Sequence, residues 1–79
     1  MYSRGELVIL GRALIGATGW TVSRLSREVA GDANTKLFTR LFAGRGCSAA
    51  SLEAASDYFN DAAPWPEGSW PDEVDRRCR

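Results

Sequence analysis

Polar side chains suited to hydrogen bonding with phosphates and base edges are concentrated in one short stretch of this 79-residue chain. They are Asn34, Thr35, Lys36, Thr39 and Arg40. Arg can donate two parallel hydrogen bonds to guanine and Asn can pair in the same way with adenine, each pair discriminating by about 1–3 kcal/mol. Arg40 is therefore the best guanine candidate, and Asn34 the adenine candidate unless its side chain is used to cap a helix.

Two short helices with a turn between them would place these side chains on one surface. Apolar residues recur at intervals of three and four in two successive segments, which puts them on one face of each helix. They are Val22, Leu25 and Val29, then Leu37, Phe38, Leu41 and Phe42. Between the segments Gly31 can adopt a positive φ and Asn34 is a good N-cap. The pattern predicts a helix-turn-helix, with helices over about 21–30 and 34–43, and it points to DNA.

A second set of residues is suited to phosphate contacts. Thr21 and Ser23 stand at the start of the first helix of the pair, where backbone N–H groups point outward, and Arg24 and Arg45 flank the two helices. A single exposed Arg or Lys on a small domain is more often just solvated. Five polar residues with two positive charges and no acid on one helix face are harder to explain in that way.

Helices are also predicted on both sides of the pair. A first helix over about 3–18 has Ser3 as N-cap and Glu6 three residues later, and Gly19 ends it. Its predicted buried stripe is Leu7, Leu10, Leu14 and Ala17. Ser48 caps a fourth helix that runs to about residue 61 and buries Leu52, Ala55, Tyr58 and Phe59. The expected fold is a compact all-α domain of four to five helices.

Two glycines inside the first predicted helix have two alternative explanations. Gly11 and Gly16 each cost about 1 kcal/mol in a helix interior relative to Ala. They either loosen the helix or allow a second helix to approach closely where there is no side chain.

From Pro64 onward the composition changes, because all three prolines and two of the three tryptophans lie there. We therefore divide the chain into a helix-turn-helix domain, 1–62, and an extended Pro- and Trp-rich tail, 63–79. Trp65 and Trp70 are expected to pack on the domain or across a dimer interface. The alternative is a recognition ligand for an aromatic groove on a partner protein.

Residue types missing from the chain exclude several functions. There is no His, and Cys47 and Cys78 form no CxxC, so neither a zinc site nor a Cys-His pair can be built, and we expect no enzyme and no cofactor. The two cysteines are expected to be free thiols, a disulfide being the alternative. No apolar run reaches membrane-spanning length, and Leu7–Leu10 is too short for a secretory signal, so a cytoplasmic location is expected.

A net charge of zero conceals an asymmetry along the chain. Residues 1–45 carry seven basic and three acidic residues, a net +4, whereas residues 46–79 carry three basic and seven acidic residues, a net −4. The basic half contains the predicted helix pair, as expected of a protein that binds a polyanion.

The helix pair resembles the λ-repressor-like, or XRE-class, helix-turn-helix domains of phage and mobile-element regulators. Leu25, Ser26 and Val29 match the first helix of that pattern, and Phe38, Leu41 and Gly44 match the recognition helix. The resemblance implies a homodimeric transcriptional repressor, in the bacterial nucleoid or an infected host cell, that reads two half-sites about one helical turn apart. The turn is about two residues longer than the family's. The alternative function is a protein-interaction module that uses the helical domain and the tail.

Overall fold

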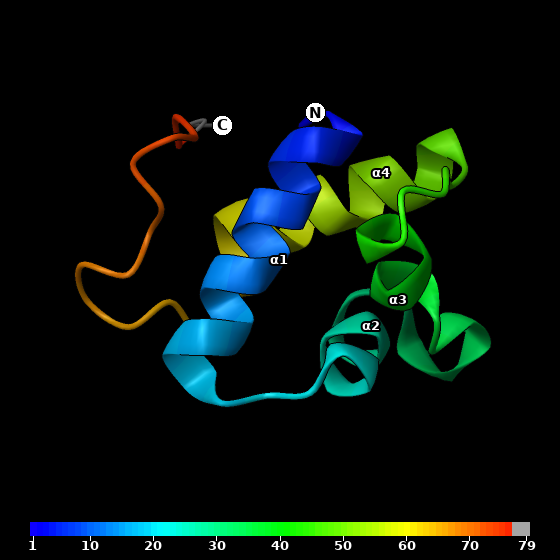
Figure 1. Ribbon diagram of the computed structural model, residues 1–79, viewed down its shortest axis with the longest axis horizontal. Helices are drawn as coiled ribbons and strands as arrows, with labels where there is room; N and C mark the ends of the chain where they lie inside the picture. Colours follow the sequence, from blue (N-terminus) through cyan, green and yellow to red (C-terminus); the bar gives the residue numbers. More distant parts are fainter. Residues whose placement is uncertain (77–79) are drawn as a thin grey trace.

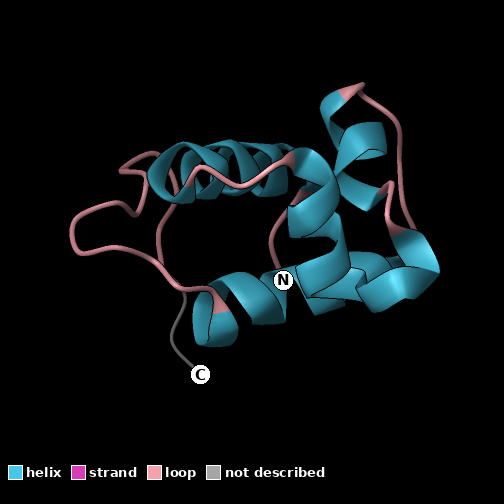
Figure 2. Ribbon diagram, turned by 90° about the horizontal axis from the view of Figure 1, so that it is seen from below, coloured by secondary structure: helices cyan, strands magenta, loops and turns pink. Residues whose placement is uncertain are grey.

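The computed structural model describes residues 1–76, apart from the side chain of Ala33, and within that range the chain is all-helical, as predicted. The helices are α1 (Arg4–Thr18), α2 (Val22–Ala30), α3 (Leu37–Phe42) and α4 (Ala49–Asp57). A 3-10 helix, η1 (Gly31–Asn34), precedes α3, and a π-helical turn, η2 (Tyr58–Ala62), extends α4. Figures 1 and 2 show α2 and α3 on one side of α1 and the C-terminal loops on the other. No helix in the described range is long and apolar enough to cross a membrane.

Three of the helices begin where the sequence predicts a cap. The Glu6 N–H donates to Ser3 Oγ at 3.1 Å, and the Ser3 N–H donates to Glu6 Oε1 at 2.9 Å, which confirms the capping box. Thr21 Oγ1 caps α2, and Ser48 caps α4 as predicted. Gly19, at φ 77°, ends α1.

The predicted start of α3 is wrong. The helix begins at Leu37, and Asn34 lies in η1 instead of capping it. Gly31, at φ 67°, turns the chain into η1, and two further residues are needed before the α-helix begins. The additional residues of the turn are thus used to build η1.

A serine of α2 caps α3 in place of a local side chain. The Phe38 N–H donates to Ser26 Oγ at 2.9 Å, and the same hydroxyl donates to the Val22 carbonyl at 3.0 Å. Ser26 is completely buried. This bond therefore holds the start of α3 on the middle of α2.

The other end of α3 is closed by Gly44, as predicted, at φ 83°. The Gly44 N–H donates to the Leu41 carbonyl at 3.0 Å and the Arg45 N–H donates to the Arg40 carbonyl at 2.9 Å, the two bonds of a Schellman motif. The motif turns the chain back so that the Arg45 backbone lies beside Arg40.

The core lies between α1 and the other helices. Its buried side chains include Leu7, Leu10, Leu14, Leu25, Leu37, Phe38, Leu41 and Phe59. Ala17, which was predicted to continue the α1 stripe, is exposed, because the stripe turns away from the core at the end of the helix. Leu52 and Tyr58 of the predicted fourth-helix stripe are only half-buried.

The two α1 glycines differ in their surroundings. A Cβ on Gly11 would lie 3.1 Å from the Phe38 ring and 3.2 Å from the Phe42 ring, whereas a Cβ on Gly16 would meet no atom within 4 Å. Close approach of a second helix therefore explains Gly11 but not Gly16.

The C-terminal segment folds back on the helices. Trp65 Nε1 donates to the Phe59 carbonyl at 2.8 Å, and Trp70 Nε1 donates to the Val74 carbonyl at 2.6 Å. Val74 is 2% exposed and belongs to the core. Arg76, near the end of the described range, lies 4.9 Å from the Trp70 ring centroid.

Tyr2 links this segment to the N-terminus. Its N–H donates to Ser56 Oγ at 2.8 Å, its hydroxyl donates to Asn60 Oδ1 at 2.7 Å, and its ring lies 6.3 Å from that of Trp70. Tyr2 is buried, so the two ends of the described chain share one part of the core.

Gly16→Ala is expected to stabilise the fold by about 0.5–1 kcal/mol, because Ala favours the helix and its Cβ meets nothing. Gly11→Ala is expected to destabilise it by about 1 kcal/mol or more, since the buried Phe38 ring has no room to move. Urea unfolding of both variants measures the difference. Equal stabilisation by both would contradict the close packing of α1 on α3.

Ser26→Ala is expected to lower the free energy of unfolding by about 1–3 kcal/mol, because the buried Phe38 N–H loses its acceptor. Ser23→Ala, on the exposed side of the same helix, is the matched control and should change it by less than about 0.5 kcal/mol. Both values come from urea titrations. Indistinguishable variants would show that the Ser26 bond does not stabilise the helix pair.

Candidate nucleic-acid interface

Four of the predicted site residues gather on the outer side of α3. Lys36, Thr39, Arg40 and Arg45 are exposed and line one open hollow of about 320 Å³. We call these four residues the α3 basic face. Lys36, Arg40 and Arg45 form no ion pair with another described residue, so their charges remain uncompensated. An uncompensated cluster of this kind favours an anionic partner.

The other two predicted base-reading residues lie at the edge of this face. Asn34 and Thr35 are half-buried and share a neighbouring hollow of about 520 Å³ with Lys36 and Arg40. Asp32 of η1 lines the same hollow. The face of α3 itself carries no acid, as the sequence indicates, but the adjoining 3-10 helix adds one negative charge that would repel a phosphate.

The predicted phosphate residues on α2 are not brought into these hollows. Thr21 Oγ1 accepts the Arg24 N–H at 3.1 Å as the helix cap. The Arg24 guanidinium lies 4.6 Å from the Trp20 ring centroid, and its Nε lies 4.0 Å from Glu28 Oε1. Arg24 is thus partly neutralised and held against its own helix. Ser23 is exposed in the first turn.

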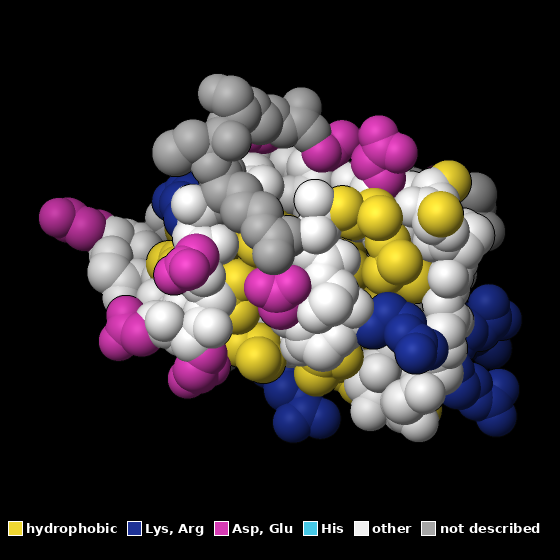
Figure 3. All heavy atoms as spheres, turned by 90° about the horizontal axis from the view of Figure 1, so that it is seen from above, with side chains coloured by type: hydrophobic (Ala, Val, Ile, Leu, Met, Phe, Trp, Pro, Cys, Tyr) yellow, Lys and Arg dark blue, Asp and Glu magenta, His cyan; other side chains and the backbone are white. Residues whose placement is uncertain are grey.

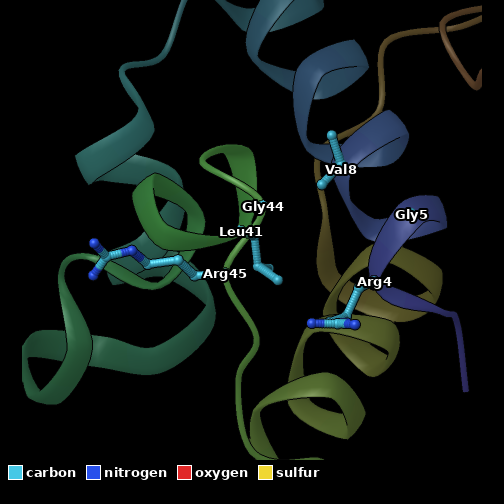
Figure 4. Close-up of a pocket in the computed structure, with 6 residues that line it drawn as sticks. All are labelled: Arg4, Gly5, Val8, Leu41, Gly44 and Arg45. Atoms are coloured by element: carbon cyan, nitrogen blue, oxygen red, sulfur yellow. The ribbon is translucent and has the colours of Figure 1, made fainter.

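Two arginines of α1, neither assigned a role from the sequence, lie against the C-terminal end of α3. Arg4 shares a hollow of about 200 Å³ with Leu41 and Arg45, shown in Figure 4. The Arg12 guanidinium lies 5.4 Å from the Phe42 ring centroid. Their spacing of eight residues places both on one edge of α1, but nothing local in the sequence links that edge to α3.

The charge asymmetry of the sequence is also an asymmetry in space. In Figure 3 most of the visible Lys and Arg side chains gather at the end of the molecule where Figure 1 places α3, whereas Asp and Glu side chains are spread from the opposite end across the middle. The proposed base-reading residues therefore stand at the basic end.

Cys47 lies half-buried in the loop between α3 and α4. Burial raises the pKa of its thiol, and the nearby Arg4 charge offsets this only in part, so the thiol stays protonated at neutral pH. Cys47 forms no disulfide with a described residue, and Cys78 lies outside the described residues. No group of three potential metal ligands occurs among residues 1–76.

Comparisons of the chain with protein-family models, with curated proteins and with solved structures find no match. The functional assignment therefore depends on the chemistry of the surface itself, above all on the α3 basic face.

Tyr58 of η2 lies near the α2 charges and has a buried hydroxyl that makes no hydrogen bond with a described residue. Burial raises the pKa of this phenol, Glu28 raises it further, and Arg24 lowers it. Because the folded-state pKa is raised, the fold favours the neutral phenol, and the associated stability is present below about pH 10 and lost as the pH rises further.

Tyr58→Phe is expected to stabilise the protein at pH 7 by about 1 kcal/mol, because it removes an unpaired buried hydroxyl. The variant should also lose less stability than the wild type as the pH rises from about 9 to about 11, because it has no phenol to ionise in that range. Tyr2→Phe is the contrasting control and should destabilise, since its hydroxyl bonds to Asn60. Thermal melts at each pH test both; destabilisation by Tyr58→Phe would mean that the hydroxyl has a partner.

Proposed function

We propose that this protein binds duplex DNA through the α3 basic face and acts as a sequence-specific transcriptional regulator, a repressor. The observation that carries the proposal is the gathering of Lys36, Arg40 and Arg45 around one hollow, where none of the three forms an ion pair with another residue of the described range. An α-helix with its side chains is about 10–12 Å across, which suits a major groove about 12 Å wide.

Within this proposal the residues of the α3 basic face have two roles, base contact and phosphate contact. Arg40 points outward from the middle of α3 and is the candidate for bidentate pairing with guanine, and Thr39 beside it donates to a base or a phosphate. Lys36 and Arg45, at the two ends of the helix, are placed to neutralise backbone phosphates. Asn34 and Thr35 approach the groove from η1.

The shortness of α3 argues for a homodimer. Its six residues extend about 9 Å along the helix axis, which corresponds to roughly three base pairs. One copy would therefore read a very short sequence. Two copies on half-sites about one helical turn, or ~34–36 Å, apart would read enough to select an operator.

Phosphate binding by the α2 end is the weaker part of the proposal. Thr21 and Ser23 stand at a helix N-terminus, but the Arg24 charge is shared with Glu28. We expect Arg24 to contribute less than Arg45, which has no acidic neighbour within ion-pair distance among the described residues.

The alternative, a protein-interaction module, is less well supported. Both indole N–H groups of the tail, those of Trp65 and Trp70, donate to carbonyls of the same chain. An aromatic-groove ligand would need those side chains to leave the core on which they pack.

Arg40→Gln is expected to weaken binding to a selected duplex about 5- to 150-fold and to relax the preference at one base pair, because a bidentate contact discriminates by about 1–3 kcal/mol. Arg76→Gln, which removes the same charge at the tail, is the matched control and should leave both unchanged. Selection from a random duplex pool, followed by titration at several salt concentrations, measures affinity and preference. Affinity independent of salt, or a pool without an enriched motif, would overturn the proposal.

A further inference from the structure

The edge of α1 that carries Arg4, Val8 and Arg12 lies against the C-terminal end of α3. We propose that Arg4 and Arg12 bind phosphates of one DNA strand while the α3 basic face occupies the adjacent major groove. This inference rests on the proposed function and adds to it a second contact surface from a different helix.

Arg4 reaches α3 across the loop that follows Gly44. In Figure 4 the Arg4 guanidinium and Leu41 point into the gap between α1 and α3, whereas the Arg45 guanidinium extends away from α1. Arg4 Nη1 lies 3.0 Å from the position of a Cβ on Gly46, so the absence of a side chain there lets the arginine lie against the loop. Arg4 and Arg45 thus place charges on two sides of one loop.

Arg12 is held at the same end of α3 by an aromatic ring. Its guanidinium lies 5.4 Å from the Phe42 ring centroid, and Phe42 is in turn packed edge-on against Phe38 in the core. A guanidinium that lies over a ring still has outer N–H groups free to bind a phosphate. Because the ring already restricts the side chain, less conformational entropy is lost when the phosphate binds.

The spacing of the two arginines suits a DNA strand. Positions 4, 8 and 12 follow one another at intervals of one helical turn along one edge of α1, and eight residues span about 12 Å. A strand of B-DNA carries one charge per ~3.4 Å of axis, so the arginines would meet phosphates about three or four nucleotides apart.

The acidic residue nearest in sequence is occupied elsewhere. Glu6 is the single acid of α1, and its carboxylate accepts the Ser3 N–H in the capping box. Neither Arg4 nor Arg12 forms an ion pair with another described residue. Both charges are therefore uncompensated within the described chain.

The salt dependence of binding tests this inference, because each phosphate contact contributes about 0.9 to the slope of log affinity against log salt concentration. Arg4→Gln and Arg12→Gln are each expected to reduce the slope by ~0.9, and the double variant by ~1.8, without changing base preference. Arg76→Gln is the matched control, since it also removes an exposed arginine that lies over an aromatic ring, here Trp70. Its slope should equal that of the wild type.

Two outcomes separate failure of the inference from failure of the proposed function. If the wild-type chain shows no salt-dependent binding to a duplex, both are overturned. If it binds and Arg40→Gln alters base preference, but Arg4→Gln and Arg12→Gln give the slope of Arg76→Gln, only the α1 contact is overturned. Circular dichroism melts of all the variants show that each is folded at the titration temperature, and the Arg4 variant retains the Arg12 contact with Phe42.

Discussion

The hydroxyl of Ser26 determines where the candidate site stands. A six-residue helix with no side-chain cap of its own is too short to be stable alone. Ser26 gives the Phe38 N–H an acceptor from a neighbouring helix, in a position without solvent, while Leu37 and Leu41 are buried beneath. Because a buried N–H left unpaired is costly, the register of α3 on α2 is fixed by this bond. The positions of the exposed residues of α3 therefore depend on the same hydrogen bond.

A second buried serine makes the same pair of hydrogen bonds near the N-terminus. Ser56 Oγ donates to the Leu52 carbonyl four residues earlier at 2.7 Å and accepts the Tyr2 N–H at 2.8 Å. In both places a serine inside a helix bonds to its own backbone and caps a distant segment. One serine fixes the basic α3 end, and the other fixes the N-terminus, next to which the acidic tail is packed.

Structural features that depend on residues close together in the sequence could be predicted, whereas those that depend on residues far apart in the sequence could not. The caps of α1 and α4 depend on residues three apart, and the exposed side of α3 follows from its apolar spacing. The start of α3 was misplaced because its cap lies twelve residues away, in α2. Tyr2 was missed because its partner is 54 residues distant, and the α1 arginines because nothing local links them to α3. The pairing of Arg24 with Glu28, by contrast, was visible in their spacing of four.

A net charge of zero is compatible with the proposed interface because the charges are separated. The molecule is 30 Å along its longest axis, and the tail and α3 lie at opposite ends of it. At physiological ionic strength exposed charges are screened within about 8 Å. A phosphate at the α3 basic face would therefore respond to Lys36, Arg40 and Arg45, with Asp32 as the nearest opposing charge on the neighbouring hollow, and the acids of the tail would be screened from it. Affinity would depend on these few local contacts instead of a general attraction, which is the condition under which base contacts decide where such a protein binds.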